Sequence, residues 1–378
     1  MQQTDRARRT PHSTIRPLRT AEDASSFHVL SKAKFGDWVT WLTQRYRVFG
    51  PKPADGQYSY GIVKTAADMD FTRAQKPLSP KKCLLPSREL LYTYETNGER
   101  VQAVIDSVPT VILGVDTCDQ HAIRLFDRIF SHGFTEQHYQ VRRSNTLIVG
   151  LECLRPCGEQ SFCHSMGTSS PATEVFDLHL VDLGDEYCFE IGSIRGRQLV
   201  AEFRGMLAAS HTDSQRRDAV LHHKLDSFKH RLDCDVTELP DLVGNASKSS
   251  HWQELGEICL ACGMCTQVCP TCYCFNIEDH VDLRLTQGSR YRTWDSCQIS
   301  EFATVAGGHN FREKRAARQR HRFMRKAKYQ YDANGMVGCV GCGRCATACL
   351  AHISPIKTFN ELWRRKKVAE RLQVGTRP

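Results

Sequence analysis

The 378-residue chain lacks the sequence features of several large protein classes. It has no apolar run approaching the roughly eighteen residues of a membrane helix, so no membrane span is predicted. No G-x-G-x-x-G follows a predicted strand and no P-loop is present, so no nucleotide fingerprint is found. No H-E-x-x-H and no evident Ser/His/Asp arrangement occurs. These absences leave no catalytic site visible in the sequence.

The N-terminal segment also lacks an export signal. Arg8 and Arg9 are not followed by an apolar segment, so neither a secretory nor a twin-arginine signal is expected. We therefore expect a cytoplasmic protein in which residues 1–25 form a basic disordered arm. The net charge of +9 is concentrated in this arm and in residues 312–328. That second run is interpreted as a solvated helix face, with docking to an acidic redox protein as the alternative. Nucleic acid is not expected as a partner, because no binding fold with interleaved aromatic residues is recognisable.

Cysteine, in contrast, is abundant. The chain has 18 cysteines, and thiols in a reducing compartment seldom form a disulfide framework. Metal clusters are the remaining physical use for so many thiolates. Since no substrate site accompanies them, the sequence indicates electron transfer rather than catalysis by this chain.

Two segments carry the most specific pattern. CLACGMCTQVCP begins at Cys259 and CVGCGRCATACL begins at Cys339, and each spaces four cysteines by two, two and three residues. Three closely spaced thiolates can wrap around one [4Fe-4S] cluster, while in two-cluster ferredoxins the fourth cysteine ligates the other cluster. Cluster 1 is therefore predicted to bind Cys259, Cys262, Cys265 and Cys349. Cluster 2 is predicted to bind Cys339, Cys342, Cys345 and Cys269.

A zinc site is the main alternative for one such segment. Zinc sites favour paired Cys-x2-Cys knuckles, and the spacing here does not follow that pattern. Glycine residues within the segments, at 263, 341 and 343, would allow the backbone to approach a cluster closely. The two segments are separated by residues 271–338, so we predict a dicluster ferredoxin-like domain with an insertion between its two motifs.

The other cysteines are less specific. Cys118 and Cys153 each follow a predicted strand of one βαβ unit, and Cys157 and Cys163 come shortly after. These four are candidates for a third [4Fe-4S] cluster, although their spacing is not that of a ferredoxin. Three further cysteines follow the first motif and are interpreted as buried thiols packed beside the clusters, with ligation of an additional cluster as the alternative. They are Cys272, Cys274 and Cys297.

The rest of the chain predicts an α+β protein. Residues 111–116 and 146–153 have the composition of buried strands, and the segment between them has helical periodicity. The polar, turn-rich segment 240–250 is predicted to hold a domain boundary. We therefore expect a mixed α/β domain over residues 26–245 and the dicluster domain over residues 246–378.

Several stretches together resemble a known family. They are KKCLLPSRELL (81–91), ILGVDTCDQHAI (112–123), SFCHSMGT (161–168), DLGDEYCFEIGS (182–193), CLACGMCTQVCPTCYCF (259–275), WDSCQISEFATVAGGHNFR (294–312) and CVGCGRCATAC (339–349). They resemble the iron–sulfur beta subunit of cytoplasmic [NiFe] hydrogenases of the sulfhydrogenase type, and equally the related iron–sulfur component of anaerobic sulfite reductase. The similarity extends over most of the chain beyond residue 25.

The resemblance implies a protein that carries electrons within a complex. A flavin subunit that exchanges electrons with NAD(P)H would lie on one side, and the small and large subunits of a [NiFe] hydrogenase on the other. In the sulfite reductase alternative, a sirohaem subunit would take the place of the hydrogenase. A further alternative is a reductase with its own flavin in the N-terminal domain. A cluster-dependent sensor that binds nucleic acid depends only on the basic run.

Overall fold

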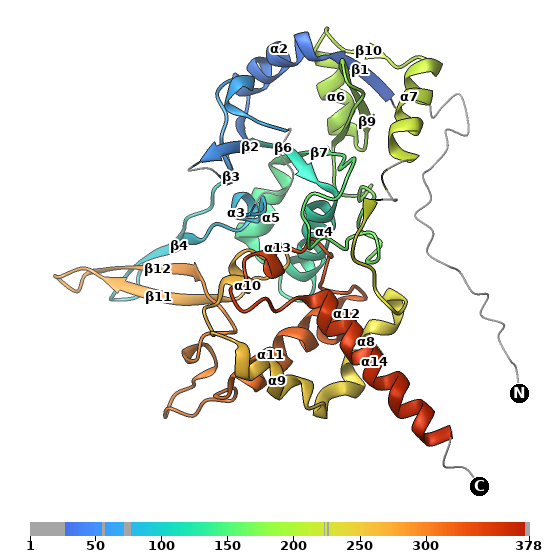
Figure 1. Ribbon diagram of the computed structural model, residues 1–378. Helices are drawn as coiled ribbons and strands as arrows, with labels where there is room; N and C mark the ends of the chain where they lie inside the picture. Colours follow the sequence, from blue (N-terminus) through green and yellow to red (C-terminus); the bar gives the residue numbers. More distant parts are fainter. Residues whose placement is uncertain (1–26, 55–56, 72–76, 223, 225–226, 375–378) are drawn as a thin grey trace, which may run out of the picture.

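The computed structural model describes residues 27–54, 57–71, 77–222, 224 and 227–374 (Figure 1). The arm expected over residues 1–25 lies outside these ranges. Helices and strands are mixed along the chain, which confirms the predicted α+β class. None of the helices that the structure describes is long and apolar enough to cross a membrane.

The N-terminal half is built around an eight-stranded mixed sheet. Across the sheet the strands are β10 (Leu207–Ala208), β1 (Phe27–Ser31), β9 (Glu186–Ile191), β8 (Leu178–Asp182), β7 (Thr146–Leu151), β6 (Thr110–Asp116), β2 (Arg47–Ala54) and β3 (Gln57–Ile62). Strands β2, β6, β7 and β8 are parallel to their neighbours in that group, and the other pairs are antiparallel.

The predicted βαβ unit is present at the centre of this sheet. Strand β6 is followed by α4 (Thr117–Ser131) and α5 (Gln137–Ser144), and β7 returns parallel to β6. Every residue of β6 and β7 is buried, because helices cover both faces. Helix α2 (Lys32–Thr43) packs on the face that carries Val111 and Leu113, and α4 packs on the face that carries Ile112. Helices α6 (Ile194–Glu202) and α7 (His211–His222) follow β9.

A second, four-stranded sheet joins the two halves of the chain. Its antiparallel strands are β11 (Phe275–Val281), β12 (Gln287–Trp294), β4 (Arg88–Glu95) and β5 (Val101–Ala103), in that order. In Figure 1 it extends to the left of the molecule. Where β4 meets β12, the buried carboxylate of Glu89 pairs with Arg292 at 2.5 Å and with Arg142. The insertion between the two cysteine motifs thus adds its strands to strands of the N-terminal half.

The remaining C-terminal residues form short helices around a second core. These elements are η3 (Val236–Glu238), α8 (Leu239–Asn245), η4 (Ala246–Lys248), α9 (His251–Ile258), α10 (Met264–Gln267), η5 (Glu301–Ala303), α11 (Arg315–Met324), the π-helix η6 (Arg325–Tyr329), α12 (Gln330–Asn334), α13 (Arg344–Thr347) and α14 (Pro355–Val374); η1 (Ala66–Asp68) and α3 (Lys81–Leu84) lie earlier in the chain. The core includes Leu242 of α8, Phe323 of α11 and Phe359 of α14. Residues before position 246 therefore share this C-terminal core.

Candidate iron–sulfur centre

The two cysteine motifs adopt the same local conformation. Gly263 (φ 78°) precedes the four-residue helix α10, and Gly343 (φ 75°) precedes the four-residue helix α13. Both glycines have left-handed backbone angles that a side chain would strain. A Cβ on Gly343 would also lie 2.4 Å from the carbonyl oxygen of Gln160, so the second motif packs tightly against the N-terminal domain. Each motif therefore curls three cysteines around a small volume.

One cavity, which we call the outer cavity, is lined by the thiols predicted for cluster 1. They are Cys259, Cys262, Cys265 and Cys349. Hydrogen-bond donors reach two of the sulfurs: the backbone N–H groups of Ala261 and Ile353 donate to Cys259 and Cys349, each at 3.4 Å. Four thiols and amide donors to sulfur match what a [4Fe-4S] cluster requires.

The outer cavity lies close to the molecular surface. The Cys262 residue is exposed. Apolar side chains that line the cavity are also open to solvent, with Leu260 60%, Met264 45% and Leu350 78% exposed. Such exposure of large apolar side chains around one site is typical of a surface that another protein covers.

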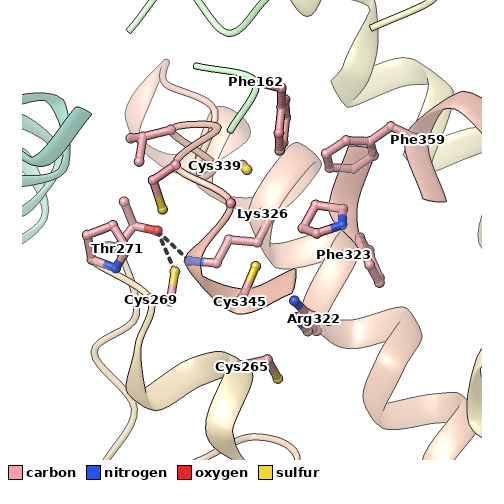
Figure 2. Close-up of a pocket in the computed structure, with 15 residues that line it drawn as sticks. Phe162, Cys265, Cys269, Thr271, Arg322, Phe323, Lys326, Cys339, Cys345 and Phe359 are labelled. Carbon is pink, nitrogen blue, oxygen red and sulfur yellow. Dashed lines mark hydrogen bonds between the residues drawn. The ribbon is translucent and has the colours of Figure 1, made fainter. Parts of the chain in front are cut away.

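A second cavity, which we call the inner cavity, is lined by the thiols predicted for cluster 2 (Figure 2). They are Cys339, Cys342, Cys345 and Cys269. The buried rings of Phe162, Phe323 and Phe359 line the same cavity and shield it from solvent. Cys265 and Arg322 line both cavities, so the two are direct neighbours.

The basic run 312–328 does not form the solvated helix face that its composition suggested. Arg318 and Arg322 of α11 are each only 5% exposed, and Arg322 lines both cavities. The following turn is a π-helix, η6, whose Lys326 also lines the inner cavity. The Lys326 ammonium donates to the Thr271 hydroxyl at 2.5 Å, and that hydroxyl lies 3.3 Å from the Cys269 sulfur. The interpretation as a solvated face is wrong here because two of these cations face thiols.

The electrostatics of the inner cavity depends on these two cations. Burial alone would lower the pKa of Lys326, but the neighbouring Cys269 and Cys272 sulfurs raise it above its usual range. Arg322 is affected in the same way by Cys265 and Cys345. Burial raises the pKa of the Cys339 thiol to about 12. Both cations thus stay charged and oppose the cost of holding thiolates in a buried site.

No group of three or more His, Cys, Asp or Glu side chains converges on a single metal ion within the residues that the structure describes. The thiols of each motif instead surround a cavity, as a multi-atom cluster requires.

The four cysteines considered for a third cluster lie at the carboxyl edge of the N-terminal sheet. Cys118 is in the first turn of α4 after β6, and Cys153 follows the parallel strand β7. Cys118 and Cys163 pack in one cluster with Val340 and Cys342 of the second motif. The charge of Cys157 raises the pKa of both Cys118 and Cys163, after the larger effect of burial. Three of the four thiols are therefore neighbours of one another and of the inner cavity.

The fourth of these cysteines, Cys153, is coupled to the others through a buried lysine. Lys224 is 5% exposed, and its raised pKa reflects the charges of Glu152, Cys153 and Cys163 acting against burial. Lys224 donates to the Glu152 carboxylate, which also accepts from His179 at 3.0 Å. This buried cation would balance negative charge on thiolates at this edge.

A buried ion pair fixes the second motif to the N-terminal domain. Arg344, inside the CGRC sequence, donates to both carboxylate oxygens of Asp119 at 2.6 and 2.7 Å, and Asp116 lies 3.6 Å away. Two backbone contacts add to it, from the N–H of Phe162 to the carbonyl of Gly341 at 2.7 Å, and from the hydroxyl of Thr168 to the carbonyl of Val340 at 2.6 Å. The sequence offered no signal for this pairing, because the partners are far apart in the chain.

Comparison with known proteins agrees with this geometry. Residues 258–353 match the family model described as a 4Fe-4S dicluster domain. The chain is similar to the sulfhydrogenase 2 subunit beta of Pyrococcus furiosus, with 32% identity over 329 residues that cover 87% of this chain and 96% of that protein. No solved structure matches the chain significantly.

Proposed function

Because the chain belongs to the sulfhydrogenase beta subunit family, we propose that it carries electrons inside a cytoplasmic hydrogenase complex. It is an iron–sulfur electron-transfer subunit. One partner in the proposal is a flavin subunit that exchanges electrons with NAD(P)H, and the other is the pair of small and large subunits of a [NiFe] hydrogenase. The 4Fe-4S dicluster match supports two [4Fe-4S] clusters.

The observation that carries the proposal is the sorting of cysteines between the two cavities. We assign Cys259, Cys262, Cys265 and Cys349 to cluster 1, because all four line the outer cavity. We assign Cys339, Cys342, Cys345 and Cys269 to cluster 2, because all four line the inner cavity. When bound, the clusters supply one-electron redox chemistry. The chain contributes the thiolates, the nearby cations and the exclusion of water.

We assign a third [4Fe-4S] cluster to Cys118, Cys153, Cys157 and Cys163. Their support is the packing of Cys118 and Cys163 against Cys342, together with the buried charge of Lys224. A cluster there would place three centres in a row, from the N-terminal domain through the inner cavity to the outer cavity. The exposed apolar rim of the outer cavity would then be one point of exchange with a partner protein.

Purification of the complex tests this function. The tagged chain would be isolated without oxygen from its native host and the associated proteins identified by mass spectrometry. Nickel-containing and flavin subunits are the expected result. A sirohaem subunit would instead favour the sulfite reductase alternative, with this chain in the same electron-transfer role. A chain that came alone, contained flavin and reduced NAD(P)H-linked dyes would contradict the proposal.

Replacing Lys326 with Met is expected to lower the reduction potential of the inner cluster. A unit charge several ångströms away at an effective dielectric constant of about 20 is worth roughly 2–3 kcal/mol, or about 100 mV. Redox titration followed by electron paramagnetic resonance would measure the shift. Lys328→Met is the matched control, because Lys328 pairs with Asp332 at 2.9 Å and does not line the cavity. Equal shifts in both variants would contradict a specific role for Lys326.

A further inference from the structure

Two thiols meet outside both cysteine-lined cavities. Cys274 and Cys297 hydrogen-bond to each other through their side chains. The base of the β11–β12 hairpin brings them together: Phe275 pairs with Trp294, and the backbone N–H of Asp295 donates to the Cys274 carbonyl at 2.9 Å. The backbone of the hairpin therefore holds the two thiols in contact.

Buried hydrogen bonds connect this thiol pair to the outer cavity. The amide nitrogen of Gln298 donates to the Cys297 sulfur at 3.3 Å. The amide nitrogen of Gln319 donates both to the Gln298 oxygen and to the Cys259 sulfur, each at 2.9 Å. Both glutamines are only 1% exposed. A continuous buried path thus joins Cys297 to a thiol assigned to cluster 1.

The two thiols differ in environment. The hydrogen bond from Cys297 is the largest effect on Cys274; together with Lys326 and Arg325, it lowers the pKa of Cys274 to about 6 despite burial. The same hydrogen bond and burial raise the pKa of Cys297. Cys274 is half-buried, whereas Cys297 is 4% exposed. An accessible thiolate beside a buried thiol is the arrangement of an attacking and a resolving cysteine.

We propose that Cys274 and Cys297 form a redox-active dithiol that reduces small-molecule disulfides with electrons carried by this protein. This inference rests on the proposed electron-transfer function. The Cys274 thiolate attacks one sulfur of the external disulfide and releases the first thiolate, which leaves a mixed disulfide. Cys297 gives up its proton to that thiolate and attacks the Cys274 sulfur, so the second thiolate leaves and a Cys274–Cys297 disulfide forms. Two electrons and two protons then restore the dithiol and protonate the product.

Thiol trapping of the cluster-loaded chain tests the pair directly. The protein would be equilibrated without oxygen in oxidised and reduced glutathione, quenched with an alkylating reagent and digested for mass spectrometry. We expect a peptide linked through Cys274 and Cys297 in the wild type. In Cys297→Ser, we expect Cys274 to carry glutathione instead. Cys188→Ser, which changes a buried thiol in β9 far from the pair in the fold, should behave as wild type.

Disulfide reduction supplies the second measurement. With reduced viologen as electron donor, either serine variant should reduce oxidised glutathione at least about tenfold more slowly than wild type, after subtraction of the uncatalysed rate. Iron content and visible absorbance should be unchanged in both variants. Loss of iron would make the two residues cluster ligands and overturn the dithiol assignment, as would the absence of the linked peptide at every glutathione ratio. If the iron-loaded wild type failed to accept electrons from viologen, the electron-transfer function itself would be contradicted.

Alkylation kinetics give a readout that a structural role would not produce. The rate of Cys274 modification by iodoacetamide should rise with pH around a midpoint near 6, because the thiolate is the reactive form. The pKa of Cys188, which burial raises to about 12, should keep that thiol unreactive over the same range. A Cys274 midpoint above about 8.5, the ordinary value for cysteine, would contradict the assignment.

Discussion

Replacing Cys349 with Ser is expected to destroy the cluster bound by Cys259, Cys262 and Cys265 while leaving the other one intact. The reason is that Cys349 lines the outer cavity, although it belongs to the second motif in sequence. A cluster that has lost one of four thiolates is held less tightly and is more open to solvent. Iron analysis should show a loss of about four iron atoms for each chain, the content of one [4Fe-4S] cluster.

The remaining cluster must then be identified, and Lys326 provides the means. In the Cys349→Ser background, the surviving signal should still shift to lower potential when Lys326 is replaced with Met, because Lys326 lines only the inner cavity. Cys269→Ser is the reciprocal variant, and its surviving signal should not respond to the Lys326 change. A Cys349→Ser protein whose surviving cluster ignores Lys326→Met would show that each motif keeps its own fourth cysteine.

Replacing Arg344 with Met is expected to destabilise the protein by about 3–5 kcal/mol, the usual cost of removing one member of a buried ion pair. Arg344 is 2% exposed and Asp119 is 1% exposed, so water cannot compensate the carboxylate that is left. The apparent midpoint of urea denaturation, followed by circular dichroism and by loss of cluster absorbance, should fall accordingly. Arg364→Met is the control, because the Arg364–Glu361 pair lies on the surface of α14.

A double variant separates charge from packing. Arg344→Met combined with Asp119→Leu removes both charges, so it should recover part of the stability lost in Arg344→Met alone. If the control Arg364→Met lowered the midpoint as much as Arg344→Met, the buried pair would have no special role in joining the second motif to the N-terminal domain.

The predictable part of the candidate site was local in sequence. The spacing of Cys259 and Cys339 with their neighbours specified the chemistry, because a cluster needs several thiolates within one short loop. The βαβ unit was predictable for a similar reason, since buried parallel strands leave long apolar runs such as that of β6.

The other parts depend on contacts between distant segments. The charge of Arg322 and Lys326 suggested solvent exposure, and only the packing of α11 and η6 against the thiols turns them inward. Their spacing of four residues was compatible with one helix face, but composition gives no sign of which face is buried. The pairing of β4 with β12 was likewise invisible, because strand register between remote segments is fixed by tertiary packing.

The four-stranded sheet has a consequence for how this protein could have evolved. Ferredoxin-type domains are often thought of as cassettes that can be moved between proteins. Here, cutting the chain before the first motif would leave β12 with an open edge and would leave buried Arg292 without the carboxylate of Glu89. Changes in β4 and in the insertion between the motifs must therefore remain compatible with each other. The electron-carrying part of this chain is inherited together with its N-terminal domain, not as a transferable module.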